Sequence, residues 1–182
     1  MKEFLGGKGA NLGHLLQAGF SVPPGFCILA SAYDAVLETP GLRDRITFLL
    51  SEVYFYDPMD VDMAGSRIRE TIVSTPLPGP IVKEIASAYQ ELMVETEGSL
   101  VAVRSSVGTK DLSVTSFPGQ MDTYHNLSSE EEVIAKVKEC WASAFSYRAL
   151  VSRHARCIDH FDVFVAPVVQ AMVASESAGV VF

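Results

Sequence analysis

The strongest constraint on the fold comes from four apolar runs that lie far apart in the sequence. They are GFCILA at 25–30, SLVAVRSS at 99–106, VFVAPVVQAMVA at 163–174 and AGVVF at 178–182. Short runs of this kind are typical of β-strands, and continuous apolar character is typical of a sheet that is covered on both faces. We therefore predict an α+β fold, with a mixed β-sheet built from both ends of the chain and helices inserted between the strands.

The predicted helices fill the stretches between these runs. Their apolar residues recur at helical spacing, and stretches rich in proline and glycine, such as PLPGP at 76–80, mark where they end. The predicted helices are 10–18, 32–38, 42–55, 60–74, 80–95 and 129–153. We predict a mostly helical insertion with a structural role over 31–98, followed over 99–182 by a strand, a loop, a long helix and further strands.

Composition limits the kinds of surface that the chain can offer. The 182 residues are 48% hydrophobic, which is enough for one domain with a real core or for two small lobes. The formal net charge of −8 and the pI near 4.9 argue against a nucleic-acid or membrane surface. Any site for an anion must therefore be local.

The three cysteines, Cys27, Cys140 and Cys157, are widely spaced and form no CxxC pair. An odd count without such a pair argues against a disulfide framework and favours a reduced compartment. The sequence also shows no secretory signal pattern and no apolar segment of membrane-spanning length. We therefore expect a cytoplasmic protein.

The first candidate site is the glycine-rich stretch at 6–9, which contains Lys8 and precedes a predicted helix. Glycine-rich segments that open helices often bind phosphate, because backbone N–H groups and the helix dipole point at the anion. The stretch matches neither the P-loop nor the dinucleotide-binding pattern. A glycine turn with a surface lysine is therefore an open alternative.

The second candidate is Arg104, which ends an apolar strand and precedes two serines. An arginine at the mouth of a central strand would be held rigidly, and its planar guanidinium suits phosphate oxygens. The alternative is an arginine that pairs with a carboxylate in the core.

Two further segments and one histidine cluster complete the candidates. The stretch TSFPGQMDTY at 115–124 is typical of a loop that closes over a ligand, although a solvated hairpin connection is also possible. The stretch VVQAMV at 168–173 suits either a strand edge that faces a purine ring or a core strand. His154, Cys157 and His160 are spaced by three, but without a fourth ligand a zinc site is the weaker interpretation.

Five motifs of the sequence, in this order, resemble the N-terminal nucleotide-binding domain of the phosphoenolpyruvate synthase and pyruvate phosphate dikinase family, which includes rifampicin phosphotransferase. They are GGKGANLGHLLQAGFSVPPGF, VAVRSS, SFPGQMDTY, CWASAFSYRA and VVQAMV, and the resemblance extends from residue 5 to 182. It implies the first, incomplete lobe of an ATP-grasp fold. It also implies an enzyme of the kinase class that transfers the β-phosphoryl group of ATP to a carrier histidine on another domain, and from there to pyruvate or a similar acceptor.

The resemblance also assigns roles to individual residues. Lys8 corresponds to a lysine that contacts the ATP phosphates and Arg104 to an arginine that neutralises their charge, as expected for a reaction that depends on positioning and charge stabilisation. The residues that match the loop closing over the triphosphate are Gly119, Gln120, Met121, Asp122 and Thr123. The residues that match the strand facing the adenine are Gln170, Met172 and Val173.

The sequence departs from the family pattern at a few positions. Lys110 stands where relatives usually carry a glutamate, and Pro118 stands where a small alanine is common, which should stiffen the loop. Arg148 and Arg153 fall in a helix motif in which Ser152 replaces a tyrosine, and we expect both arginines to be structural.

Other parts that the resemblance implies lie outside this sequence. They are the acidic ligands of Mg²⁺, the second nucleotide lobe and the phosphohistidine domain, which would be the partners of this chain. None of the four histidines, His14, His125, His154 and His160, matches the carrier motif. A nucleotide-binding or regulatory module without catalysis is therefore the alternative to an enzyme fragment, and the phosphoryl acceptor stays open.

Overall fold

The computed structural model describes residues 2–109 and 122–179, and its helices and strands agree with the α+β class. Between β1 and β2 lie four helices, in the stretch where an insertion was expected. The elements in chain order are α1 (Lys2–Gln17), β1 (Gly25–Cys27), α2 (Ala30–Leu37), α3 (Leu42–Ser51), α4 (Pro58–Ser74), α5 (Gly79–Glu95), β2 (Val101–Arg104), β3 (Val107–Thr109), β4 (Thr123–Leu127), α6 (Glu130–Ala142), the 3-10 helix η1 (Ser143–Phe145), α7 (Tyr147–Ala155), β5 (Val163–Val165) and β6 (Val168–Ala171).

The main sheet joins strands that are distant in sequence, in the order β1-β6-β2-β4, and β3 pairs with β5 in a second sheet. Every pairing among the described strands is antiparallel, so the predicted mixed sheet is wrong for this part of the chain. The reason is the position of β6. The chain returns through α2–α5 so that β2 runs parallel to β1, but β6 lies between these two strands and is antiparallel to both.

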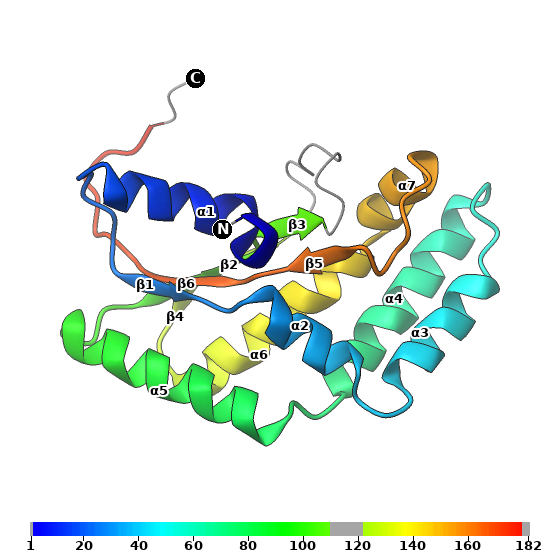
Figure 1. Ribbon diagram of the computed structural model, residues 1–182, viewed down its shortest axis with the longest axis horizontal. Helices are drawn as coiled ribbons and strands as arrows, with labels where there is room; N and C mark the ends of the chain where they lie inside the picture. Colours follow the sequence, from blue (N-terminus) through cyan, green and yellow to red (C-terminus); the bar gives the residue numbers. More distant parts are fainter. Residues whose placement is uncertain (1, 110–121, 180–182) are drawn as a thin grey trace.

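Helices cover both faces of the sheet. In Figure 1, α1 lies over one face, and α5 and α6 lie over the other. The helix α4 packs against α3, α6 and α7 and extends the helical layer beyond the strands. None of the helices in the described ranges is long and apolar enough to cross a membrane.

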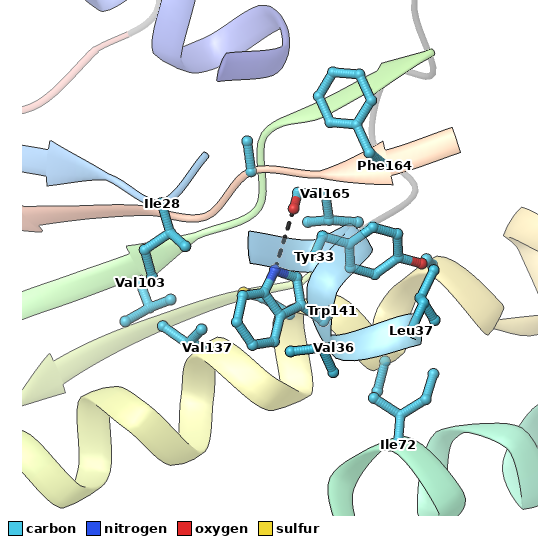
Figure 2. Close-up of a cluster of buried hydrophobic side chains, with 14 of the residues drawn as sticks. Ile28, Tyr33, Val36, Leu37, Ile72, Val103, Val137, Trp141, Phe164 and Val165 are labelled. Carbon is cyan, nitrogen blue, oxygen red and sulfur yellow. Dashed lines mark hydrogen bonds between the residues drawn. The ribbon is translucent and has the colours of Figure 1, made fainter. Parts of the chain in front are cut away.

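The hydrophobic core surrounds Trp141 of α6, whose side chain is fully buried (Figure 2). Its indole N–H donates to the carbonyl oxygen of Val165 at 3.2 Å, which ties α6 to β5. Val103 of β2, Val137 and Ile72 belong to the same buried cluster. Because α6 is anchored to β5 and packs against β2, the core fixes the end of β2, where the candidate arginine lies.

The single helix predicted over 129–153 is wrong, because the chain forms α6 and α7 with η1 between them. The Ser143 hydroxyl donates to the carbonyl of Cys140 at 2.6 Å. Ser146 has an extended backbone, and its side chain accepts from the N–H of Ala149 to cap α7. Serine side chains compete with helical backbone bonds in this way, and apolar spacing does not reveal it.

The predicted limits of the other elements also need correction. The helix expected at 10–18 begins at Lys2, so the glycines at 6–9 lie within α1. The strand expected over 163–174 is divided at Pro167, which has no N–H for a ladder and whose carbonyl accepts from Ile28 at 2.8 Å. Residues 178–179 form no strand, and 180–182 lie outside the described residues.

Candidate functional site

The site begins where α1 contacts the segment after β2. Gly6 has φ 63° and ψ −174°, a conformation that is available almost only to glycine. A Cβ atom there would lie 2.6 Å from the hydroxyl oxygen of Ser106. That hydroxyl accepts from the N–H of Gly9 at 3.1 Å and donates to the carbonyl of Leu5 at 2.6 Å. The glycine-rich stretch is therefore a kinked helix start that is fastened to Ser106.

This contact brings Lys8 to the end of β2. The Lys8 amine donates to the carbonyl oxygen of Ser105 at 2.5 Å. Partial burial lowers the pKa of Lys8, and the positive charge of Arg104 lowers it further. The two cations, 96 residues apart in sequence, therefore lie close enough to repel each other.

Arg104 is held from the neighbouring strand. Its Nη1 donates to Oε1 of Gln170 at 3.0 Å, and Nε2 of Gln170 donates to the carbonyl of Pro23 at 3.1 Å. Among the described residues Arg104 forms no ion pair, so the structure gives no support there to the alternative of a core carboxylate. Both cations thus have neutral oxygen acceptors.

The start of β4 completes the rim of the site. Thr123 pairs with Arg104 in the sheet, and the Ser105 N–H donates to the Asp122 carbonyl at 3.3 Å. The thiol of Cys140 also donates to that carbonyl, at 3.9 Å. Burial, followed by the charge of Asp122, raises the pKa of Cys140 to about 12 and therefore keeps it a thiol at neutral pH.

The strand assigned to the adenine gives a mixed result. Val168–Ala171 pairs with β1 on one side and β2 on the other, so the core-strand alternative is confirmed and the strand-edge alternative is wrong. The Met172 N–H donates to the carbonyl of Leu100 at 2.8 Å, and its sulfur accepts from the N–H of Asn126 at 3.1 Å. Val173 is 64% exposed.

The sequence of this chain is similar to those of a known protein family. The sequence matches the family described as pyruvate phosphate dikinase, AMP/ATP-binding domain, over residues 2–182. The chain belongs to this family. It is 43% identical over 182 residues to a probable phosphoenolpyruvate synthase of Staphylothermus marinus, with 98% of this chain and 22% of that protein covered.

Two further relatives are also named probable phosphoenolpyruvate synthase. The chain is 44% identical to the probable phosphoenolpyruvate synthase of Archaeoglobus fulgidus, with 98% of this chain and 24% of the relative covered. It is 40% identical to that of Methanothermobacter thermautotrophicus, with 97% and 26% covered. The chain therefore spans about a quarter of the length of these relatives, and the family model that it matches describes an AMP/ATP-binding domain.

Several residues predicted for this family site lie outside the described residues. They are Gly119, Gln120 and Met121 of the predicted loop, together with the departures Lys110 and Pro118. Sequence reasoning assigned no role to Ser105, Ser106 or Pro23. The carbonyl of Ser105 binds Lys8, the hydroxyl of Ser106 fastens the start of α1, and the carbonyl of Pro23 binds Gln170. The two serines that directly follow Arg104 were the available signal, whereas nothing marked the carbonyl of Pro23.

The histidine cluster is not arranged as a metal centre. His154 stacks on Phe55 with ring centroids 4.0 Å apart, and His160 accepts from Nε of Arg153 at 3.0 Å. Within residues 2–109 and 122–179, no group of three or more histidine, cysteine or acidic side chains is placed to hold a metal ion. Cys157 is exposed.

Proposed function

We propose that this chain is the ATP-binding lobe of a dikinase-type phosphotransferase, in which Lys8 and Arg104 hold the phosphates. The observation that carries the proposal is the convergence of these two cations at the end of β2, where each is bound by a neutral oxygen. In a protein with a net charge of −8, two adjacent cations that have no carboxylate partner among the described residues are suited to binding an anion.

The electrostatics support an anionic ligand. The Lys8 pKa is lowered partly by Arg104, which means that each charge disfavours the other in the absence of a ligand. A triphosphate between them would relieve this repulsion and would form charge-assisted hydrogen bonds with both groups. In phosphoryl transfer, fixed cations of this kind position the phosphates and stabilise the developing charge.

The remaining steps rest on the family and on residues outside the described ranges. Thr123 is the first residue of β4 and not part of a loop, contrary to what the resemblance implies. We propose that Asp122 and Thr123 lie beside the triphosphate, with Gly119, Gln120 and Met121, and that Met172 and Val173 lie beside the adenine. The phosphoryl group would pass to a carrier histidine on a further domain and then to pyruvate or a similar acceptor, in the cytoplasm. Mg²⁺ would accompany the ATP, but the described residues do not form a metal site, so we assign them no step with the metal.

A titration with MgATP, followed by NMR of the 182-residue chain, tests the proposal. We expect shifts at Lys8, Arg104 and their neighbours, and a loss of affinity of about tenfold or more in Lys8→Met, because one charge-assisted bond is removed. Lys83→Met, which removes an exposed lysine on α5, is the matched control. Unmoved resonances at millimolar MgATP, or equal affinity in Lys8→Met and the wild type, would contradict the proposal.

A further inference from the structure

We propose that Gln170 is a positioning residue for Arg104, which it aims and holds without neutralising its charge. This inference rests on the proposed function, because it specifies how the phosphate-binding arginine is prepared for its ligand. It also gives Gln170 a role different from the adenine contact that the family resemblance implies.

The side-chain amide of Gln170 is engaged at both ends. Its oxygen accepts from Arg104 at 3.0 Å, and its nitrogen donates to the carbonyl of Pro23 at 3.1 Å. Only one orientation of the amide satisfies both partners, because a flipped amide would place N–H groups against the guanidinium and an oxygen against a carbonyl. The Pro23 carbonyl therefore selects the orientation that presents oxygen to Arg104.

The backbone around Gln170 is rigid. The residue is 7% exposed and pairs with Gly25 of β1 on one side and Ala102 of β2 on the other. A Cβ atom at Gly25 would lie 2.9 Å from the Cα of Gln170, so glycine allows the connector that carries Pro23 to pass closely. Two strands and the connector therefore hold the amide in place.

The neutrality of the amide is the functional point. A glutamate at this position would pair with Arg104 and cancel the charge that a phosphate requires, whereas glutamine orders the guanidinium and leaves its charge intact. Lys8 likewise has an uncharged acceptor, because its amine donates to the carbonyl of Ser105. The site thus orients two cations with uncharged acceptors and keeps both charges available.

The test compares Gln170→Leu and Gln170→Glu with Gln90→Leu, a control that removes an exposed amide on α5. The probes are MgATP, inorganic tripolyphosphate and adenosine. We expect Gln170→Leu to lower the affinities for ATP and for tripolyphosphate by a similar factor, about five- to twentyfold, and to leave the affinity for adenosine unchanged. Gln170→Glu should lower the affinities for both anions more than Gln170→Leu does, because the carboxylate neutralises Arg104. In Arg104→Met, Gln170→Leu should cause no further loss.

The alternative roles give different results. A loss of adenosine affinity without a loss of tripolyphosphate affinity would assign Gln170 to the adenine and overturn the proposal. The proposal would also be overturned if Gln170→Leu lowered the affinity for tripolyphosphate in Arg104→Met as much as it does in the wild type. If the wild type binds none of the probes, the proposed function fails, while the positioning role is still decided by NMR of the Arg104 guanidinium. Its rotation should be slow in the wild type and fast in Gln170→Leu; equal rates in two folded proteins would refute the role.

Discussion

Arg104 and Arg153 are both held by neutral acceptors among the described residues, and they differ in their access to solvent. Arg104 is half-buried beside Lys8 and bonds to Gln170. Arg153 of α7 is 1% exposed, bonds to His160 and to the carbonyl of Ala144, and lies 5.5 Å from the ring centroid of Phe145. The same kind of bonding therefore holds an arginine that is partly exposed and an arginine inside the fold.

The difference shows how burial decides the role of a cation. Burial lowers the pKa of Arg153 to about 10, and its donors are used to tie α7 to η1 and to the segment before β5. No ligand can reach it, so its charge serves the structure, as expected for this arginine. Arg104 has one described donor bond and an exposed neighbour, Lys8, so its remaining donors can serve a ligand.

The largest predicted effect is on stability and separates the two arginines. Arg153→Met should lower the free energy of unfolding by about 2–3 kcal/mol, because the Ala144 carbonyl and the His160 nitrogen lose their donor inside the protein. Arg104→Met should change it by less than about 1 kcal/mol, because its loss removes repulsion with Lys8. Urea denaturation of both variants measures the contrast. Equal losses would show that the open site is structural as well.

The second prediction concerns the kink that places Lys8 at the open site. Gly6→Ala should lower the free energy of unfolding by about 1–2 kcal/mol, because alanine is strained at φ 63° and its Cβ atom would contact Ser106. The substitution should also lower the affinity for MgATP, since the amine of Lys8 would move with the start of α1. Gly13→Ala, within the same helix, is the control and should stabilise slightly. If Gly6→Ala is destabilised but its affinity for ATP is unchanged, the kink at Gly6 is not needed to place Lys8 for ATP binding.

The helices of the insertion were predictable because their signals are local. Asp57 accepts from the N–H of Met59 and caps α4, and Pro58 occupies its first turn, as sequence rules for helix starts require. The break between α6 and α7 was missed because it depends on the Ser143 and Ser146 side chains, which the apolar spacing ignores. Local signals thus give helices and their caps but not every interruption.

The two charged groups of the candidate site could be chosen from the sequence, whereas the groups that hold them could not. Lys8 and Arg104 stand out in sequence because cations beside glycines and strand ends are typical of phosphate sites. Their partners follow from pairings between residues about 65 to 150 positions apart, such as Gln170 with Pro23. A strand pattern identifies β6 as a strand, but it does not say which strands flank it, and that placement turns Gln170 towards Arg104.

The smallest predicted effect is a pH dependence of the stability that comes from His160, the acceptor of the buried Arg153. Burial, followed by the charge of Arg153, lowers the pKa of His160 to about 4, while Asp159 opposes the shift and His154 adds to it. The unfolded chain, with a pKa near 6.5, then binds the proton more readily than the folded one. Stability should be level above about pH 7 and fall as the pH decreases from about 6.5 towards 4.

The variant His160→Asn isolates this contribution, because asparagine keeps an acceptor for Arg153 but does not titrate. Between pH 7 and 5 the wild type should lose about 1 kcal/mol more unfolding free energy than the variant, after allowance for partial solvent exposure. Urea denaturation at the two pH values gives the difference. Parallel losses would mean that folding does not lower the pKa of His160, and the prediction would be wrong.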